Sequence, residues 1–350
     1  MSHPLTRRLF GRSIGAAALA SALPRPAVAQ SPLRLKMVLN WRYQGPQAWF
    51  FLAQDRGHFR EAGLEIAIDQ GNGSGAAVGS VASGSYDVGF GDINALIQFV
   101  AARPAGEGTP LAVYAMYNRP PFAVAVKADG PIKAPKDLEG RTLGGPANDG
   151  ALKLFPAFAK LTGVDPAKVQ IVNMQPSLRE QMLRRGQVEG VFGYVNTIRF
   201  SAKLVGIDPD KEFRFIAYGD HGMDLYSNAL VVSRKLAAEN PAAVRGLLRA
   251  VNKGLADTLK DLDAAVDAVA RREPLIDKAV EKERLVATLG DEMNHPEIAR
   301  LGVGDVDDAR FKRSIDAVVE ADRLPRTPAA EEIFSRAFLP PVAERVNKVA

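Results

Sequence analysis

The chain has 350 residues, which is more than one hydrophobic core usually organises, and this length predicts two domains. Hydrophobic residues make up 47% of the chain and charged residues 24%, as is ordinary for a globular protein. The absence of cysteine excludes disulfides, thiolate metal sites and cysteine nucleophiles. Four histidines leave little room for a histidine-rich metal site, so we expect no bound metal.

Residues 1–29 have the pattern of a twin-arginine signal peptide. Thr6–Phe10 contains a pair of arginines, an apolar stretch follows at 14–23, and Ala27–Ala29 is typical of a signal-peptidase site. The alternative is a membrane anchor, but the apolar stretch is shorter than the roughly 20 residues that a span needs. The segment contains four arginines and no acid, so it accounts for most of the formal charge of +5. We therefore expect a nearly neutral, exported, periplasmic protein with no nucleic-acid partner.

The stretch after residue 34 predicts a βαβ unit of a parallel sheet. A strand with Leu35, Met37 and Leu39 on one face ends at the turn Asn40–Trp41, an apolar helix spans Ala48–Asp55, and a second strand spans Leu64–Ile68. In such sheets, ligands bind beyond the carboxyl ends of the strands. We therefore expect the turn after the first strand to form one wall of a small-molecule pocket.

The remaining elements follow in both halves of the chain as strand, turn and helix. We expect strands at 86–90, 111–116, 122–126, 141–143, 169–173, 190–194, 213–217 and 230–232, helices at 94–102, 150–161 and 177–185, and mostly helix after residue 240. This echo predicts two α/β lobes joined near Tyr117–Pro121 and Asp220–Tyr226. Lobe 1 would comprise residues 30–118 and 224–350, and lobe 2 residues 119–223, with the pocket between them.

The predicted ligand-binding residues lie at turns between strands and helices. Helix N-termini suit anionic or carbonyl ligands, and aromatic side chains can stack on a flat ligand while their polar tips bond its edges. On these grounds the candidates are Asn40, Trp41, Tyr43, Gln47, Ser74, Gly75, Asp92, Asn94, Asn148, Asp149, Tyr194, Asn196 and Tyr226. The alternative for Ser74, Asn148 and Asp149 is a helix-capping role alone.

A glycine pattern supports one rival interpretation. Gly71-x-Gly73-x-x-Ala76 follows a predicted strand, opens a helix, and has Asp92 about 20 residues further on, as in a dinucleotide fingerprint. The alternative function is therefore an exported dinucleotide-dependent oxidoreductase. Against it, the pattern follows the second strand of its domain, and no acid–base set for hydride transfer accompanies it. We expect instead that these glycines let the backbone approach a ligand closely.

Motifs spread over nearly the whole mature chain resemble those of bilobal periplasmic substrate-binding proteins of the nitrate/taurine/alkanesulfonate/thiamine-precursor group. They are Leu39–Trp41, Phe51–Gly57, Glu61–Leu64, Gly84–Gly89, Asp137–Arg141, Gly193–Tyr194, Tyr226–Asn228 and Phe338–Pro340. The resemblance implies an α/β, Venus-flytrap, type II-like architecture. It also implies a monomer that closes its lobes on a ligand and delivers it to an ABC permease, with no catalysis and no cofactor.

The chain also departs from that group's pattern. Thiamine-precursor binders usually have a histidine where this chain reads Gly45–Gln47, and their pyrimidine-reading glutamate is replaced in the region Val195–Ile198. Eukaryotic pyrimidine synthases of the same fold rely on a cysteine-rich motif, which this chain lacks. We therefore expect a small organic ligand (a sulfonate, an aromatic or other carboxylate, or a pyrimidine-like molecule) and no enzymatic activity.

Overall fold

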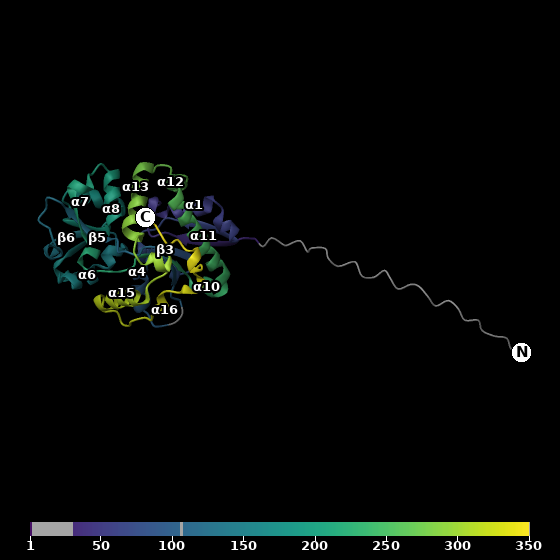
Figure 1. Cartoon of the computed structure of the whole chain (residues 1–350). Helices are drawn as coiled ribbons and strands as arrows, with labels where there is room; N and C mark the ends of the chain where they lie inside the picture. Colours follow the sequence, from purple (N-terminus) through teal and green to yellow (C-terminus); the bar gives the residue numbers. More distant parts are fainter. Residues whose placement is uncertain (2–30, 106–107, 350) are drawn as a thin grey trace. The chain divides into compact units, whose positions relative to one another are not determined.

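The computed structural model describes Met1 and residues 31–105 and 108–349. Apart from Met1, the expected signal segment lies outside the described residues. Residues Pro32–Ala350 form one compact unit, drawn in Figure 1 in colours from purple to yellow. Within the described part, no helix is long and apolar enough to cross a membrane.

The first sheet has the strand order β2-β1-β3-β10-β4. Strand β1 is parallel to β2 and β3, as the predicted βαβ unit requires, whereas β10 is antiparallel to both of its neighbours. The strands span Leu33–Val38 (β1), Leu64–Asp69 (β2), Val88–Asp92 (β3), Leu111–Ala115 (β4) and Asn228–Val232 (β10).

The second sheet has the order β7-β6-β8-β5-β9 and repeats the pattern of the first. Its antiparallel strand is β5, which again lies fourth in the order, between β8 and β9. The strands span Phe122–Lys127 (β5), Thr142–Gly145 (β6), Gln170–Asn173 (β7), Gly190–Tyr194 (β8) and Phe213–Ala217 (β9). The repeated strand, turn and helix pattern in the two halves of the sequence thus corresponds to two sheets of the same topology.

We call the part built on the first sheet the first lobe and the part built on the second sheet the second lobe. The chain passes from one sheet to the other between β4 and β5 and returns between β9 and β10. These two connections contain the predicted segments Tyr117–Pro121 and Asp220–Tyr226. The exact lobe bounds remain a prediction.

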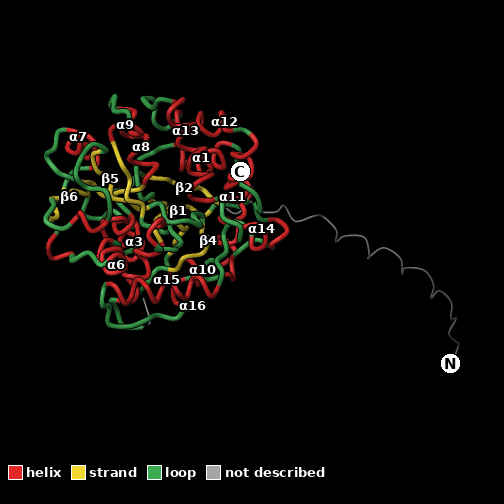
Figure 2. Tube along the Cα trace, turned by 60° about the vertical axis from the view of Figure 1, so that its left-hand side comes forward, coloured by secondary structure: helices red, strands yellow, loops and turns green. Residues whose placement is uncertain are grey.

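Helices cover the faces of both sheets, as Figure 2 shows in red around the yellow strands. In the first part of the chain they are α1 (Ala48–Asp55), α2 (His58–Glu61), α3 (Ser74–Ala82), α4 (Ile93–Ala101), α5 (Gly150–Lys153), α6 (Phe155–Thr162), α7 (Arg179–Arg184), α8 (Val195–Leu204) and α9 (Pro209–Glu212). The helical C-terminal part has α10 (Arg234–Glu239), α11 (Pro241–Lys260), α12 (Leu262–Ala270), α13 (Lys278–Thr288), α14 (Ile298–Leu301), α15 (Asp308–Ala321) and α16 (Ala330–Ile333).

The core of the first lobe explains why α1 is apolar throughout. Trp49, Phe50 and Phe51 are all buried, and α1 packs against α11. A Cβ atom on Gly254 of α11 would lie 2.3 Å from the carbonyl oxygen of Trp49, so only glycine permits this close helix contact. The sheet above α1 is thereby held in place, and with it the turn at Asn40–Trp41 that follows β1.

The structure corrects two helix predictions and shows a helix that the sequence analysis did not expect. The predicted helix 150–161 is two helices, because Pro156 has no N–H to continue the hydrogen-bond ladder. The predicted helix 177–185 starts with a 3-10 turn, Pro176–Leu178, ahead of α7. Helix α8 directly follows β8 without a turn, and the sequence analysis missed it.

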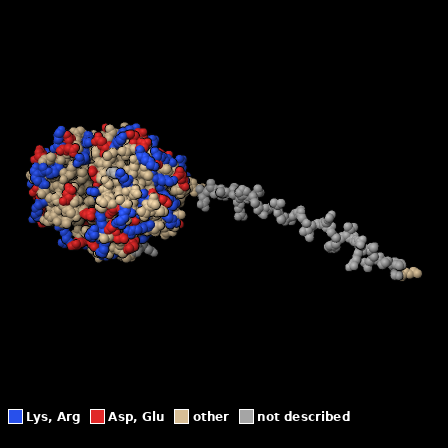
Figure 3. All heavy atoms as spheres, in the orientation of Figure 1, with Lys and Arg blue, Asp and Glu red and all other residues tan. Residues whose placement is uncertain are grey.

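Basic and acidic side chains are interspersed over the face of the molecule in Figure 3. That face shows no broad field of one sign.

Candidate ligand-binding site

A cavity lies between the two lobes, where strands of both sheets end. The volume that the centre of a water-sized sphere can reach between its walls is about 30 Å³. The first lobe and the C-terminal segment packed on it contribute Asn40, Trp41, Gln44, Pro46, Gln47, Gly73, Ser74, Tyr117, Asn228, Thr288 and Glu292. The second lobe contributes Asp149, Gly150, Arg179, Tyr194 and Thr197. The cavity is therefore narrow in this arrangement of the lobes, with room for about two water molecules.

Hydrogen bonds cross from one lobe to the other beside the cavity. The hydroxyl group of Tyr194 donates to Oδ1 of Asn228 over 3.0 Å and lies 3.4 Å from Oγ of Ser74. The N–H of Gly75 donates to the carbonyl oxygen of Asn148 over 3.4 Å. The structure therefore shows the lobes in contact around the cavity.

Arg179, at the start of α7, is the only basic side chain among the lining residues of the described chain. It is buried, and its Nε and Nη2 donate to Oε1 of Glu180 over 2.9 and 2.7 Å. Its Nη1 lies 3.4 Å from the carbonyl oxygen of Phe192 and 4.0 Å from Oδ2 of Asp149. The guanidinium carbon lies 5.7 Å from the centre of the Trp41 ring. Two carboxylates thus balance this single charge.

The cavity also has two buried acids, one from each lobe. Burial raises the pKa of Asp149, although Arg179 and the N–H groups of Ala151 and Leu152 act in the opposite direction. Burial, together with neighbouring Asp291, likewise raises the pKa of Glu292 to about 8, although the hydrogen bond from Asn196 acts in the opposite direction. Near neutral pH the protonated form of Glu292 is therefore favoured in this site.

Glu292 belongs to a π-helical turn, Leu289–Met293, that continues α13. Such turns occur frequently at functional sites. Its carboxyl oxygen accepts a hydrogen bond from Nδ2 of Asn196 on α8 over 3.3 Å. Its carbonyl oxygen accepts the N–H groups of Asn118 and Arg119 on the first inter-lobe connection, over 2.9 and 3.0 Å. One residue of the cavity wall is thereby bonded to the opposite lobe and to the hinge region.

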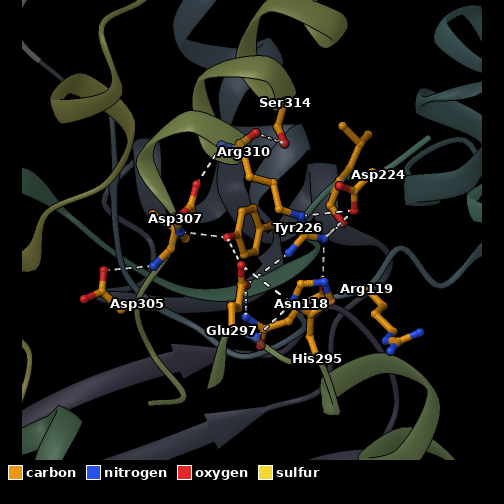
Figure 4. A network of polar contacts seen from close by, with 12 residues as sticks. Asn118, Arg119, Asp224, Tyr226, His295, Glu297, Asp305, Asp307, Arg310 and Ser314 are labelled. Carbon is orange, nitrogen blue, oxygen red and sulfur yellow. Dashed lines mark hydrogen bonds and ion pairs between the residues drawn. The ribbon is translucent and has the colours of Figure 1, made fainter. Parts of the chain in front are cut away.

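A second polar network, shown in Figure 4, holds both inter-lobe connections together, and we call it the hinge network. Arg310, in the first turn of α15, donates to the carbonyl oxygen of Asn118 over 2.6 Å and to Oδ1 of Asp224 over 2.7 Å. Its Nη1 donates to Oε1 of Glu297 over 3.0 Å. Glu297 also accepts the hydroxyl group of Tyr226 over 2.8 Å. Because Asn118 and Asp224 lie on different connections, Arg310 fixes one connection against the other.

Six of the thirteen predicted site residues line this cavity: Asn40, Trp41, Gln47, Ser74, Asp149 and Tyr194. Asp149 also caps α5, since its Oδ1 accepts the N–H of Ala151 over 2.8 Å. Asp149 therefore both caps α5 and lines the cavity. Ser74 lies within the first turn of α3 and makes no capping bond.

The other seven do not line the cavity: Tyr43, Gly75, Asp92, Asn94, Asn148, Asn196 and Tyr226. Tyr43 bonds the carbonyl oxygen of Ile68, and Tyr226 belongs to the hinge network. Asp92 caps α4 by accepting from Asn94, while Asn196 is directed towards Glu292 and Asp291. Gly75 and Asn148 bond each other across the lobes. These residues satisfy protein partners, which sequence position alone does not reveal.

The sequence analysis missed ten lining residues: Gln44, Pro46, Gly73, Tyr117, Gly150, Arg179, Thr197, Asn228, Thr288 and Glu292. Some had a signal, because Gly73 lies in the glycine-rich turn and Asn228 ends the motif Tyr226–Asn228. Thr288 and Glu292 had no such sequence signal, since the C-terminal helical segment that contains them has an ordinary amphipathic pattern. The described residues hold no cluster of three or more His, Asp or Glu side chains that could bind a metal ion.

Comparisons with known proteins agree with this architecture. A family model described as NMT1/THI5 like matches residues 46–265. The riboflavin-binding protein RibY of Chloroflexus aurantiacus is 24% identical over 322 residues, which cover 90% of this chain and 88% of RibY. The 4-amino-5-hydroxymethyl-2-methylpyrimidine phosphate synthase of Legionella pneumophila is 23% identical over 251 residues, which cover 71% of this chain and 76% of the synthase.

Among solved structures, the alkanesulfonate-binding protein SsuA of Xanthomonas axonopodis pv. citri, bound to MOPS, superimposes with a TM-score of 0.65. The match covers 88% of this chain and 98% of SsuA at 16% identity, so it supports a conclusion about the fold alone. The periplasmic aliphatic sulphonate-binding protein SsuA of Escherichia coli gives a TM-score of 0.63. The expected two-lobe, type II periplasmic-binding-protein fold is confirmed.

Proposed function

Because the chain belongs to the NMT1/THI5-like family, we propose that it is a solute-binding protein of an ABC-type importer. It captures a small organic ligand between its lobes and delivers it to a permease in the inner membrane. The observation that carries this proposal is the cavity itself, whose walls come from both lobes and whose rim is closed by bonds such as that from Tyr194 to Asn228. A ligand that contacts both walls stabilises the closed arrangement over the open one.

Export to the periplasm, by a twin-arginine signal in residues 1–29, forms part of the proposal. The support is the sequence pattern of that segment, together with the periplasmic location of the E. coli structural neighbour. We propose further that the mature protein works as a monomer. Its two lobes supply every wall of the cavity, so that capture needs no second copy.

An enzymatic function is the second candidate, because several sequence relatives are pyrimidine phosphate synthases. We favour capture without catalysis. The cysteine-rich motif on which the eukaryotic synthases rely has no counterpart in a chain without cysteine. The buried acids of the cavity also accept hydrogen bonds within the protein. Asp149 bonds the N-terminus of α5, and Glu292 bonds Asn196. The decisive assay is formation of 4-amino-5-hydroxymethyl-2-methylpyrimidine phosphate by the purified protein, which a receptor does not catalyse.

The dinucleotide alternative receives little support from the glycine-rich turn. A Cβ atom on Gly71 would collide with the carbonyl oxygen of Leu39, and one on Gly73 would lie 2.3 Å from the carbonyl oxygen of Asn148. Close backbone approach within the protein thus accounts for both glycines. The space in front of Gly73 is taken by the second lobe, where the fingerprint would need a pyrophosphate.

A thermal-shift screen of the mature chain tests the receptor function. The panel holds riboflavin, thiamine, taurine, MOPS, aromatic carboxylates, nitrate and NAD⁺. A ligand at 100 times its dissociation constant stabilises the folded state by about 2.7 kcal/mol, which a melting curve resolves. Trp41→Ala should abolish the shift, whereas the control Trp49→Phe, in the core under the sheet, should retain it. A shift with NAD⁺ alone would contradict the proposal and favour the oxidoreductase.

A further inference from the structure

A groove beside the second inter-lobe connection is larger than the cavity between the lobes. It lies between α6 of the second lobe, that connection, and α15, which packs against α4 of the first lobe. Its volume is about 460 Å³, whereas small-molecule pockets typically measure about 300–1,000 Å³ and occur preferentially at domain interfaces. None of the residues that line the groove lines the interlobe cavity. The groove is therefore a separate space that is large enough for a small molecule.

All three elements contribute apolar side chains to this groove. Met223 and Leu225 of the connection are buried beneath it, and Leu161 of α6 and Ala317 of α15 are exposed along it. A Cβ atom on Gly222 would lie 3.8 Å from Cδ2 of Leu161, so the connection runs directly beside α6. The Leu161 side chain is 53% exposed. An apolar ligand in the groove would remove this surface from water, which is favourable.

The charged residues of the groove leave one positive group without a counter-charge. Lys160 on α6 and Glu320 on α15 form an ion pair over 2.6 Å, which joins the two helices and bounds the groove on one side. Asp224 pairs with Arg310 of the hinge network over 2.7 Å. Arg313, exposed on α15, forms no ion pair or hydrogen bond with its side chain in the described part of the chain. A guanidinium group in this situation suits a carboxylate, which it can bind through two parallel N–H donors.

We propose that this groove is a second small-molecule site, which binds an amphipathic monocarboxylate such as a medium-chain fatty acid. The alkyl chain covers Leu161, Met223 and Ala317, and the carboxylate pairs with Arg313. This inference goes beyond the proposed receptor function, because it does not involve the cavity between the lobes. Since the walls of the groove belong to different lobes, the bound molecule contacts both of them.

Decanoate and decylammonium provide a matched test, because they share an alkyl chain and carry opposite charges. Binding to the mature protein at pH 7 is measured by isothermal titration calorimetry, at concentrations below those at which either probe forms micelles. We expect decanoate to bind at least about tenfold more tightly than decylammonium, because only the carboxylate is attracted by the guanidinium group. Octanoate should bind about tenfold more weakly than decanoate, since it buries two methylene groups fewer.

Five variants locate the probe, and their melting temperatures show whether each of them is folded. Ala317→Trp fills the groove and should abolish decanoate binding, whereas Ala242→Trp, at an exposed position of α11, should not. Arg313→Gln should reduce the preference for decanoate over decylammonium, and the exposed Arg249→Gln controls for loss of charge. Trp41→Ala alters the interlobe cavity and should leave decanoate binding unchanged.

Absence of decanoate binding, or binding that persists in Ala317→Trp, overturns the proposal. Loss of binding in Trp41→Ala also overturns it, because the probe would then occupy the interlobe cavity. A preference for decanoate that survives Arg313→Gln overturns the assignment of the carboxylate to Arg313. The thermal-shift screen decides separately whether the protein is a receptor, so failure of the groove proposal leaves that function standing.

Discussion

The hydroxyl group of Tyr194 donates a hydrogen bond to Oδ1 of Asn228, 3.0 Å away, and this bond joins the two sheets at the cavity. Tyr194 ends β8 of the second sheet, and Asn228 begins β10 of the first. Both side chains are less than a tenth exposed, so the bond is shielded from water. It can form only when the lobes are close together, and it therefore stabilises the closed arrangement over the open one.

Tyr194→Phe should shift the protein towards an open arrangement. The substitution keeps the ring and removes the bond, at a cost of about 1 kcal/mol, which corresponds to about fivefold weaker ligand binding. Because the chain has no native cysteine, Lys211→Cys and Leu275→Cys allow one fluorophore on each lobe, and energy transfer between them reports closure. Both positions are highly exposed, at 84% for the Lys211 side chain and 93% for Leu275.

Tyr218→Phe is the matched control for this measurement. Its hydroxyl group donates to the carbonyl oxygen of Ala151 over 2.9 Å, and both residues belong to the second lobe. The loss of stability should be similar, but energy transfer should not change. An equal change in both variants would mean that the Tyr194 bond is not specific to closure.

Arg310→Met should strongly destabilise the fold, because it breaks the hinge network of Figure 4. The side chains of Arg310 and Glu297 are 6% and 7% exposed, so Glu297 would be left as a buried carboxylate without its cation. Removing one partner of such a pair typically costs about 3–5 kcal/mol. Chemical denaturation measures the change in the free energy of unfolding.

Lys312→Met on the same helix serves as the control, since Lys312 is exposed and, among the described residues, pairs with Asp316 alone. It should leave the free energy of unfolding nearly unchanged. If Arg310→Met cost less than about 1 kcal/mol, Glu297 would have to be protonated or solvated, and the hinge would not depend on this ion pair.

Glu292 should make stability fall as the pH rises. Its folded-state pKa is about 8, against an ordinary value of 4.5, so between these values the folded chain holds a proton that the unfolded chain has released. Stability therefore decreases through this window, by up to about 1.4 kcal/mol per pH unit, and levels off above it. Glu292→Gln should reduce the slope, as measured by denaturation at a series of pH values.

Part of the slope should remain in that variant. Burial also raises the pKa of Asp92, to about 7, and this contribution has the same sign. Glu283→Gln, an exposed acid on the adjoining helix α13, controls for loss of charge. An unchanged slope in Glu292→Gln would show that water or a counter-ion solvates the Glu292 carboxylate.

The sequence predicted most of the fold because its periodic signals are local. The helix Ala48–Asp55 and the strands Gly190–Tyr194 and Phe213–Ala217 lie where they were expected, since an apolar run between Gly, Pro or polar turns specifies each of them. The wall at Asn40–Trp41 was also predictable, because it follows a strand end. These predictions needed only neighbours in the sequence.

The rest of the cavity depends on contacts between distant segments. Glu292 reaches it only because α13 packs against α8 of the opposite lobe, and α8 itself was not expected. In the sequence, nothing distinguishes Arg179 from the other basic residues of its helix. In the structure its side chain is buried and pairs with Glu180. Tyr226 was predicted as an aromatic wall; in the structure it does not line the cavity and bonds Glu297, which is 71 residues away in the sequence.

Gly73→Ala should prevent full closure of the lobes. Comparison with Gly84→Ala distinguishes this effect from that of backbone strain alone. Gly73 has a φ of +100°, and a Cβ atom there would lie 2.3 Å from the carbonyl oxygen of Asn148 in the second lobe. Gly84 has a φ of +76° with no atom within 4 Å of its Cβ position, so Gly84→Ala introduces similar strain without the collision. Each variant should lose about 1–2 kcal/mol of stability, since alanine disfavours positive φ.

Only Gly73→Ala should lower energy transfer between the labelled lobes and weaken ligand binding by more than about tenfold, the equivalent of 1.4 kcal/mol. The reason is that Asn148 must retreat from the added methyl group, and the bond from the Gly75 N–H to the Asn148 carbonyl oxygen is lost with it. If the two variants bound ligand equally well, Asn148 would have to move without opening the cavity. The contact between the glycine-rich turn and the second lobe would then be incidental to capture.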